Sequence, residues 1–216
     1  MLPAPGADPI RVTASGGPTS FNGVPDWVYE EEVLSGETAA WWSPDGRRLA
    51  FLASDERDVP EYEFPVYNPS LTPGAQAYPD KVIMRYPKPG YSNPTVQVSL
   101  FDLGAYQDSP SGRPTLATGL GNSTAVDAAV TAVTYTLEFD SPFPTNDVVI
   151  GEVSWVSPKE LLVKATNRIA SVQRVAYFDL GKVSAEQGTV VGKVVREVDM
   201  AERDGGWVEA VSRICR

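Results

Sequence analysis

The segment 39–53, AAWWSPDGRRLAFLA, constrains the fold of this chain most strongly, because it predicts a β-hairpin. One strand is expected at Ala39–Trp42, and SPDG at residues 43–46 is expected to form the turn. Proline pre-sets the first turn angle, aspartate caps its own backbone, and glycine accepts a positive φ. The return strand is expected at Arg47–Ala53, where apolar side chains alternate along the strand.

Short alternating segments of the same kind recur along the chain, separated by turn residues that include many of its 19 prolines and 18 glycines. No long stretch shows the period of about 3.6 residues that marks an amphipathic helix. This succession predicts an all-β sandwich, barrel or propeller. Besides the hairpin, the expected strands are Tyr62–Tyr67, Lys81–Arg85, Thr95–Asp102, Val148–Val156, Glu160–Asn167, Ser171–Leu180 and Thr189–Asp199.

Two parts of the chain resemble each other. AAWWSPDGRRLAFLASDER at residues 39–57 and VSWVSPKELLVKATNRI at residues 153–169 both place a tryptophan and Ser-Pro before a charged turn and an apolar strand. Each is followed by a strand that ends in Phe-Asp-Leu, at residues 101–103 and 178–180. Such a repeat is typical of propeller blades, while two unrelated hairpins remain the alternative.

Charge and composition exclude several kinds of site. The net charge of −10 and the pI of about 4.5 argue against nucleic acid as a partner and are compatible with cationic ligands. The sequence has no histidine, so neither a Ser-His-Asp triad nor a histidine metal site can be built from it. Cys215 is the single cysteine, so no internal disulfide or cysteine zinc cluster is possible. We expect no metal and no cofactor.

The ends and domain limits are expected as follows. Residues 1–21 form an irregular segment with a short strand at Ile10–Thr13, and residues 22–216 form the main domain. The N-terminal sequence has neither a signal peptide nor a membrane span, and it assigns no compartment. Asn122, in Asn-Ser-Thr, is a glycosylation acceptor pattern that matters only in a secretory compartment.

The run Glu30–Glu32 places three carboxylates side by side, between a tyrosine and an apolar pair. A solvated charge run is the common interpretation of such a pattern. A metal site would need oxygen ligands from several segments, and no calcium-loop spacing surrounds the run. A glycosidase pair would need carboxylates on opposite sides of a bond rather than adjacent in sequence. Capture of an ammonium group is the fourth interpretation.

The backbone conformation of this run decides which glutamates act together. On a strand, Glu30 and Glu32 share a face and Glu31 points away. On a helical turn, neighbours lie roughly 100° apart, so Glu31 and Glu32 converge. The following Val33-Leu34 tolerates a helix and Gly36 is a natural stop. The residues alone leave both conformations open.

The octet Asp-Trp-Val-Tyr-Glu-Glu-Glu-Val at residues 26–33 resembles the double-glutamate signature of the dipeptidyl peptidase IV family, serine peptidases of the prolyl oligopeptidase group. The similarity continues through residues 39–67, 78–103 and 194–209, and is weakest between Gly104 and Asp147. Its overall character is that of fungal dipeptidyl aminopeptidases. The resemblance implies that residues 22–216 are about three to four blades of an eight-bladed N-terminal β-propeller, with a short helical turn that carries the glutamate pair.

The resemblance also implies site residues and an activity. Members release Xaa-Pro or Xaa-Ala dipeptides from peptides with a free N-terminus, whose α-ammonium the propeller holds while a serine of an α/β-hydrolase domain attacks. By position, Glu31 and Glu32 would be the amine ligands, with Glu30 structural. Asp26, Trp27 and Tyr29 would be supporting residues of the motif, with Trp27 and Tyr29 packing to fix the segment.

This sequence departs from the family pattern in its catalytic parts. It contains no Gly-x-Ser-x-Gly nucleophile motif and no histidine, so the α/β-hydrolase domain is missing and no catalytic residue is assigned. The chain alone is expected to be inactive. A non-catalytic propeller-like interaction module is the alternative function. The resemblance further implies a homodimer, and a full-length protein that is membrane-anchored, vacuolar or secreted.

Overall fold

The computed structural model describes residues 9–67, 78–109, 128–182 and 188–209. Strands dominate it, so the all-β prediction is confirmed. The elements are β1 (Ser20–Asn22), the π-helical turn η1 (Tyr29–Leu34), β2 (Ala40–Trp42), β3 (Arg48–Asp55), β4 (Glu61–Val66), β5 (Asp80–Arg85), β6 (Thr95–Asp102), α1 (Leu103–Asp108), β7 (Thr134–Phe139), β8 (Val148–Ser157), β9 (Glu160–Asn167), β10 (Val172–Asp179), the 3-10 turn η2 (Leu180–Lys182) and β11 (Thr189–Asp199).

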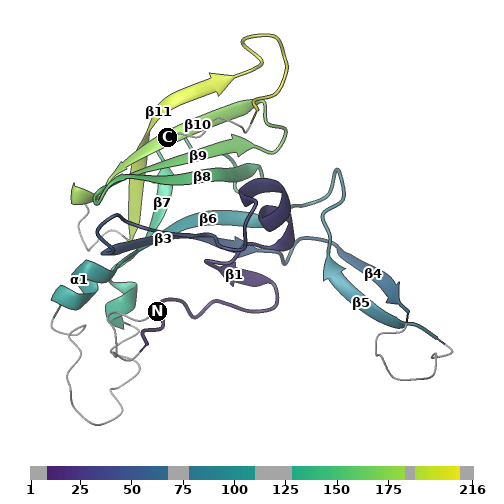
Figure 1. Cartoon of the computed structure of the whole chain (residues 1–216). Coiled ribbons are helices and arrows are strands. Elements are labelled where there is room, and N and C mark those ends of the chain that lie inside the picture. The colour runs from purple at the N-terminus through teal and green to yellow at the C-terminus, as the bar shows by residue number, and fades with distance from the viewer. Residues whose placement is uncertain (1–8, 68–77, 110–127, 183–187, 210–216) are drawn as a thin grey trace, which may run out of the picture.

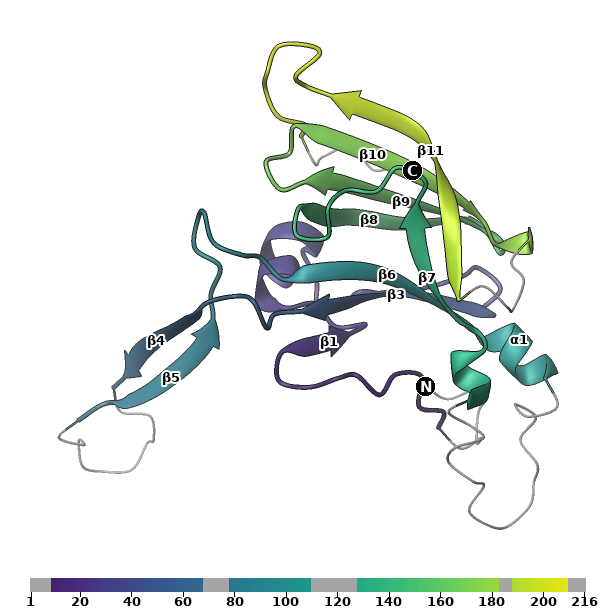
Figure 2. The ribbon, with the colours of Figure 1, turned by 180° about the vertical axis from the view of Figure 1, so that it is seen from behind.

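Nine strands form one curled sheet in the order β1-β3-β6-β7-β11-β10-β9-β8, with β2 also paired to β3. Neighbouring strands are antiparallel except β7 and β11, which run parallel. In Figures 1 and 2, β7 stands upright between a lower group (β1, β3, β6) and an upper group (β8–β11). The sheet therefore folds back on itself as an open half-barrel with a shared core.

The two similar sequence segments form equivalent hairpins. β2 pairs with β3, and β8 pairs with β9. In the first turn, Asp45 Oδ1 accepts hydrogen bonds from Ser43 Oγ at 2.6 Å and from Arg47 N at 3.1 Å, while Gly46 takes a φ of 66°. Each hairpin pairs with a third strand, which is β6 in the first unit and β10 in the second. A fourth strand, β7 in the first unit and β11 in the second, gives each unit the four antiparallel strands of a propeller blade.

The repeated Phe-Asp-Leu sequence ends a strand and starts a helical turn. Asp102 Oδ1 accepts a hydrogen bond from Ala105 N at 2.8 Å at the start of α1. Asp179 Oδ1 accepts one from Gly181 N at 3.1 Å at the start of η2. The aspartate thus acts as an N-terminal cap in both places, which explains why the same three residues recur after corresponding strands.

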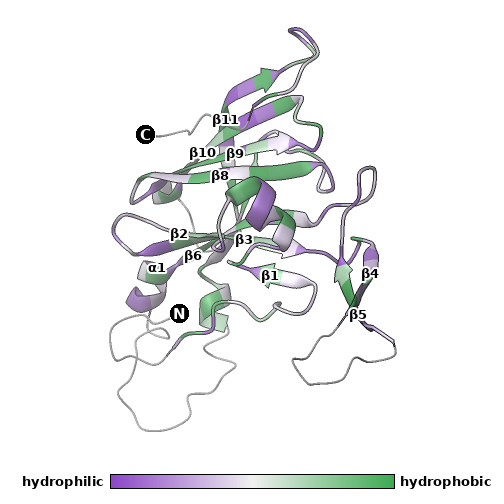
Figure 3. Cartoon of the chain, turned by 45° about the vertical axis from the view of Figure 1, so that its right-hand side comes forward, coloured by the Kyte–Doolittle hydropathy of each residue, from purple (hydrophilic) through white to green (hydrophobic). Residues whose placement is uncertain are grey.

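A hydrophobic core fills the space between the lower and upper groups. Leu100 from β6 and Val163 and Phe178 from the upper sheet are among its fully buried side chains. A direct hydrogen bond also joins the groups, because the Trp155 indole N–H donates to the Trp41 carbonyl at 3.0 Å. Figure 3 shows η1, with a hydrophilic outer side, between β8 and the lower strands. Apolar side chains of η1, including Tyr29, pack in this core, which therefore holds the turn.

The β4–β5 hairpin forms a separate two-stranded sheet that projects from the body (Figure 1). Its strands occur where Tyr62–Tyr67 and Lys81–Arg85 were predicted, with shifts of one residue. Lys81 Nζ and Glu63 Oε1 form an ion pair of 2.6 Å across it. Because the hairpin pairs with no other strand, it joins the body only at its root, where β4 begins and β5 ends.

Three features differ from the expectation. The structure has no strand at Ile10–Thr13; Ile10 and Val12 instead pack against a second apolar cluster that contains Phe101. β1 begins at Ser20, inside the segment expected to be irregular, because it pairs with the end of β3. β7 and α1 lie where no regular element was predicted.

None of the helices in the described ranges is long and apolar enough to cross a membrane.

Candidate functional site

The glutamate run forms a helical turn, which is one of the two backbone conformations that the sequence left open. Asp26 starts the turn: its Oδ2 accepts a hydrogen bond from Val28 N at 3.0 Å, and its carbonyl accepts one from Glu30 N at 2.9 Å. The turn ends at Ser35, whose φ of 53° is left-handed, one residue before the expected stop at Gly36. Its hydrogen bonding is π-helical, a wide turn that is often found at functional sites.

Tyr29 fixes the turn to the upper sheet. Its side chain is 4% exposed, and its hydroxyl accepts a hydrogen bond from Ile150 N at 3.2 Å. Ile150 adjoins a shift in the β8–β9 register. Burial raises the pKa of the Tyr29 phenol, so the hydroxyl stays protonated. The turn therefore cannot move independently of β8 without breaking a buried hydrogen bond.

Trp27 fixes the other side of the turn to the root of the β4–β5 hairpin. Its indole N–H donates to the Arg85 carbonyl at 3.0 Å, and its ring lies 5.0 Å from that of Tyr86 between centroids. The Arg85 guanidinium in turn donates to the Val59 carbonyl at 2.7 Å. Trp27 and Tyr29 thus make specific contacts with two different sheets.

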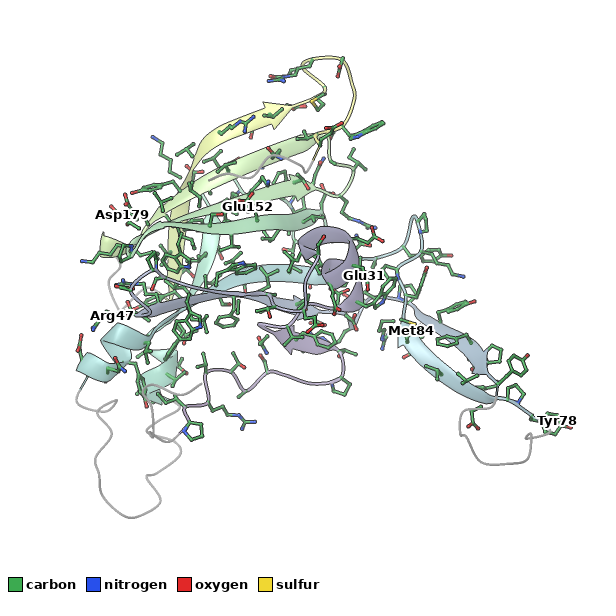
Figure 4. All side chains as sticks on the ribbon, viewed as in Figure 1. Glu31, Arg47, Tyr78, Met84, Glu152 and Asp179 are labelled. Atoms are coloured by element: carbon green, nitrogen blue, oxygen red, sulfur yellow. The ribbon has the colours of Figure 1, made fainter. Side chains whose placement is uncertain are left out.

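The three glutamates differ in exposure. Glu30 is partly buried, whereas Glu31 and Glu32 are exposed neighbours on η1. Figure 4 places Glu31 on the turn, at the side from which the hairpin with Met84 projects. None of the ion pairs found among the described residues involves Glu31 or Glu32. The turn thus carries two adjacent, exposed carboxylates.

Sequence reasoning did not find the residues that support the turn from other elements. Ile150 on β8 donates to Tyr29, and Arg85 at the end of β5 accepts from Trp27. Glu56, directly after β3, interacts through charge with Asp26 and Arg85. No local sequence pattern marks these three residues as partners of the turn. The nearest sequence indication was the predicted strand that ends at Arg85, because the end of a strand can bring a residue to the place where two elements meet.

A cavity of about 800 Å³ is lined by residues of β1, β3, β6, β7, β8 and the 142–145 loop, including Ser54, Val98 and Ile150, the hydrogen-bond partner of Tyr29. Glu31 and Glu32 do not line it. The described residues contain no group of three or more acidic, histidine or cysteine side chains placed to hold a metal. Asn122 falls outside the described residues.

The fold and this turn define a class: an all-β, propeller-type region that presents an exposed glutamate pair on a rigidly held helical turn. The family model for the dipeptidyl peptidase IV (DPP IV) N-terminal region matches residues 3–215. The chain therefore belongs to this family, as its double-glutamate motif indicated.

Curated relatives agree with this placement. The chain is 40% identical over 204 residues to a protein of Tuber melanosporum named probable dipeptidyl-aminopeptidase B, covering 92% of this chain and 19% of that protein. It is 38% identical over 205 residues to a protein of the same name from Chaetomium globosum, covering 93% of this chain and 18% of the relative. The chain thus spans about a fifth of the length of these relatives.

A solved structure shows the same fold. The crystal structure of Porphyromonas gingivalis dipeptidyl peptidase 4 superposes with a TM-score of 0.61 and 24% identity, over 88% of this chain and 21% of that chain. The fold-class prediction of a partial propeller is thereby confirmed.

Proposed function

We propose that this chain is the substrate-binding propeller segment of a serine-type dipeptidyl aminopeptidase, and that Glu31 and Glu32 hold the α-ammonium of the peptide. The observation that carries the proposal is the geometry of η1. It presents two adjacent exposed carboxylates, while Tyr29 and Trp27 hold the turn to two separate sheets.

Two carboxylates suit an ammonium group better than one. An ammonium has three N–H donors, and charge-assisted hydrogen bonds to carboxylates are shorter and stronger than neutral ones. A cation between Glu31 and Glu32 also offsets the repulsion between their charges. The net charge of −10 attracts cationic N-termini over a range of about 8 Å at physiological salt.

Anchoring the amine would determine where the peptide is cut. Two residues of extended chain span about 7 Å, so a serine at that distance from the glutamate pair reaches the second peptide bond. The sequence has no histidine and no Gly-x-Ser-x-Gly motif, so the nucleophile belongs to an α/β-hydrolase domain that acts together with this segment. Released products would be Xaa-Pro or Xaa-Ala dipeptides.

Amine binding by the chain itself tests the proposal. NMR titration with Ala-Pro-amide is expected to shift the Glu31 and Glu32 side-chain signals, while N-acetyl-Ala-Pro-amide, which lacks the ammonium, is not. Glu31→Gln and Glu32→Gln are each expected to weaken binding about 10-fold or more. Glu37→Gln, also exposed and nearby, removes the same charge and is the control. Equal binding of both ligands would favour a non-catalytic interaction module instead.

A further inference from the structure

The wall of the 800 Å³ cavity contains a buried hydroxyl group that has no hydrogen-bond partner. Ser54 lies near the end of β3 and is 8% exposed, and its Oγ has no partner among the described residues. Because side chains alternate along a strand, Ser54 shares a face with Leu52 of the core. Val96 stands opposite Ser54 on β6 and lines the same cavity. The hydroxyl therefore points to the side on which the cavity lies.

This hydroxyl indicates a ligand. A buried polar group that is left without a partner costs stability, and the large majority of such groups in proteins are hydrogen-bonded. Natural proteins tolerate exceptions mainly at functional sites. A serine hydroxyl can donate one hydrogen bond and accept others. A ligand that brings an amide into the cavity would give Ser54 Oγ the partner that it lacks in the described part of the chain.

The rest of the lining indicates the chemistry of that ligand. The Arg57 side chain donates to both carboxylate oxygens of Asp55, so the charges of these two lining residues compensate each other. Glu138 also lines the cavity and is exposed. Such a cavity fits an uncharged ligand that combines apolar groups with amides, and its volume lies in the range of about 300–1,000 Å³ that is usual for ligand pockets. Apolar side chains of the core and its margin form a large part of the wall: Val96, Val98, Leu137, Phe139, Phe143 and Ile150.

The loop that forms one wall of the cavity is held by two other strands. The Arg174 guanidinium on β10 donates to the Ser141 carbonyl at 3.1 Å and lies over the Phe143 ring, 4.4 Å from its centroid. The backbone N–H of Val194 on β11 donates to Asp140 Oδ1 at 2.9 Å. These contacts fix the loop before a ligand arrives, which lowers the entropy cost of binding.

The cavity lies at the same end of the strands as the glutamate turn. η1 precedes β2, and because β2 runs antiparallel to β3, η1 lies toward the end of β3. The cavity is lined by the last residues of β3 and β7 and by the first residues of β6 and β8. Ile150 also lines it, and the Ile150 N–H donates to the Tyr29 hydroxyl of η1. One residue of β8 thus contacts both the turn and the cavity.

We propose that the cavity binds an uncharged, apolar stretch of peptide, and that Ser54 Oγ forms a hydrogen bond with one of its backbone amides. The inference rests on the proposed function, because this stretch is the part of the substrate that follows the two residues anchored through Glu31 and Glu32. Apolar side chains of the peptide displace water from the cavity wall, which favours binding. The cavity therefore selects peptides by the residues beyond the cleaved bond.

Peptide length tests the cavity site. Ala-Pro-Val-Leu-amide is expected to bind the unaltered chain about 10-fold more tightly than Ala-Pro-amide. Its binding should shift the methyl NMR signals of Val98 and Leu137, but not those of Val153, which is buried elsewhere in the core. Ala-Pro-Gly-Gly-amide has the same length without the apolar side chains and should gain little. Equal affinities of the two longer peptides, without shifts at Val98 and Leu137, would overturn the proposal.

Ser54→Ala separates a role in ligand binding from a role in stability. The substitution removes a hydroxyl that has no partner among the described residues, so Tm is expected to stay equal or to rise. The affinity for Ala-Pro-Val-Leu-amide should fall about fivefold, because a peptide amide loses its partner. A lower Tm with an unchanged affinity would contradict the proposal, since the hydroxyl would then serve the fold.

A bulky side chain at the cavity gives a test with a matched control. Thr145 and Asn146 are exposed neighbours, and of the two only Thr145 lines the cavity. Thr145→Trp is expected to remove the affinity gain of Ala-Pro-Val-Leu-amide over Ala-Pro-amide, whereas Asn146→Trp should preserve it. Equal gains in the two variants would place the peptide outside the cavity.

The cavity site and the amine site can fail separately. N-acetyl-Ala-Pro-Val-Leu-amide lacks the ammonium and is expected to bind at least about 10-fold more weakly than the free-amine peptide. If it binds equally well and still shifts the Val98 and Leu137 signals, the cavity takes a separate peptide segment and the amine site is wrong. If Ala-Pro-amide binds better than its N-acetyl form but the Val-Leu extension changes nothing, the amine site stands and the cavity site is wrong.

Discussion

The Tyr29 hydroxyl accepts a hydrogen bond from the backbone N–H of Ile150 at 3.2 Å, across 121 positions of sequence. The contact joins the glutamate turn to the upper sheet at a place where β8 departs from regular pairing with β9. Because both atoms are buried, this bond, together with the Trp27 contact to Arg85, holds the turn that carries Glu31 and Glu32.

Tyr29→Phe tests this contact. The substitution leaves the Ile150 N–H buried without an acceptor, which costs about 1–3 kcal/mol of unfolding free energy. Chemical denaturation measures the loss, and the affinity for Ala-Pro-amide should fall with it. Tyr67→Phe, at a side chain that is 74% exposed, is the matched control and should change neither quantity. Unchanged stability in Tyr29→Phe would mean that the turn is not held by this bond.

Trp27→Phe keeps an aromatic ring against Tyr86 but removes the donor to the Arg85 carbonyl. We expect a loss of about 0.5–1.5 kcal/mol and faster amide hydrogen exchange at the hairpin root than in the core strands. Trp207→Phe, at a side chain that is 72% exposed, is the control. If exchange at the root of β5 were identical in the two variants, the indole would not be connecting the turn to the hairpin.

Gly192→Ala tests the point where β11 passes from β7 to β10. A Cβ at this position would lie 2.5 Å from Phe178 Cε1, and Phe178 is fully buried in the core. Overpacking of this kind typically costs about 1–3 kcal/mol. Gly17→Ala meets nothing within 4 Å and is the control. Equal unfolding free energies for the two variants would argue against the β7–β11 junction.

Glu160→Gln tests the register of β9 against β10. Tyr177 Oη donates to Glu160 Oε1 at 2.6 Å, and this hydrogen bond raises the pKa of Tyr177 to about 12. Removing the carboxylate should lower that pKa toward the ordinary value of about 10, as followed by the ¹³Cζ signal of Tyr177. The diagonal contact exists only in this register, so a pKa that is unchanged would indicate a different pairing.

Local chemistry decided what the sequence could predict. The turn at 43–46 was predictable because its proline, aspartate and glycine each have a defined turn role. The β7–β11 pairing was not, because parallel strands from distant segments leave no local signal. Likewise, Glu31 and Glu32 could be proposed from an eight-residue motif, but no sequence pattern links Tyr29 to Ile150, which lies 121 positions away and meets it only in the folded chain.

The central claim is that Glu31 and Glu32 hold the substrate amine, and it is tested most directly in a working enzyme. Residues 3–215 would replace the matching segment of the Tuber melanosporum relative, and kcat/KM would be measured for an Ala-Pro reporter. Glu31→Gln and Glu32→Gln are each expected to lower kcat/KM by about 10- to 100-fold, while Glu37→Gln leaves it unchanged. Wild-type activity in Glu31→Gln and Glu32→Gln would contradict the account.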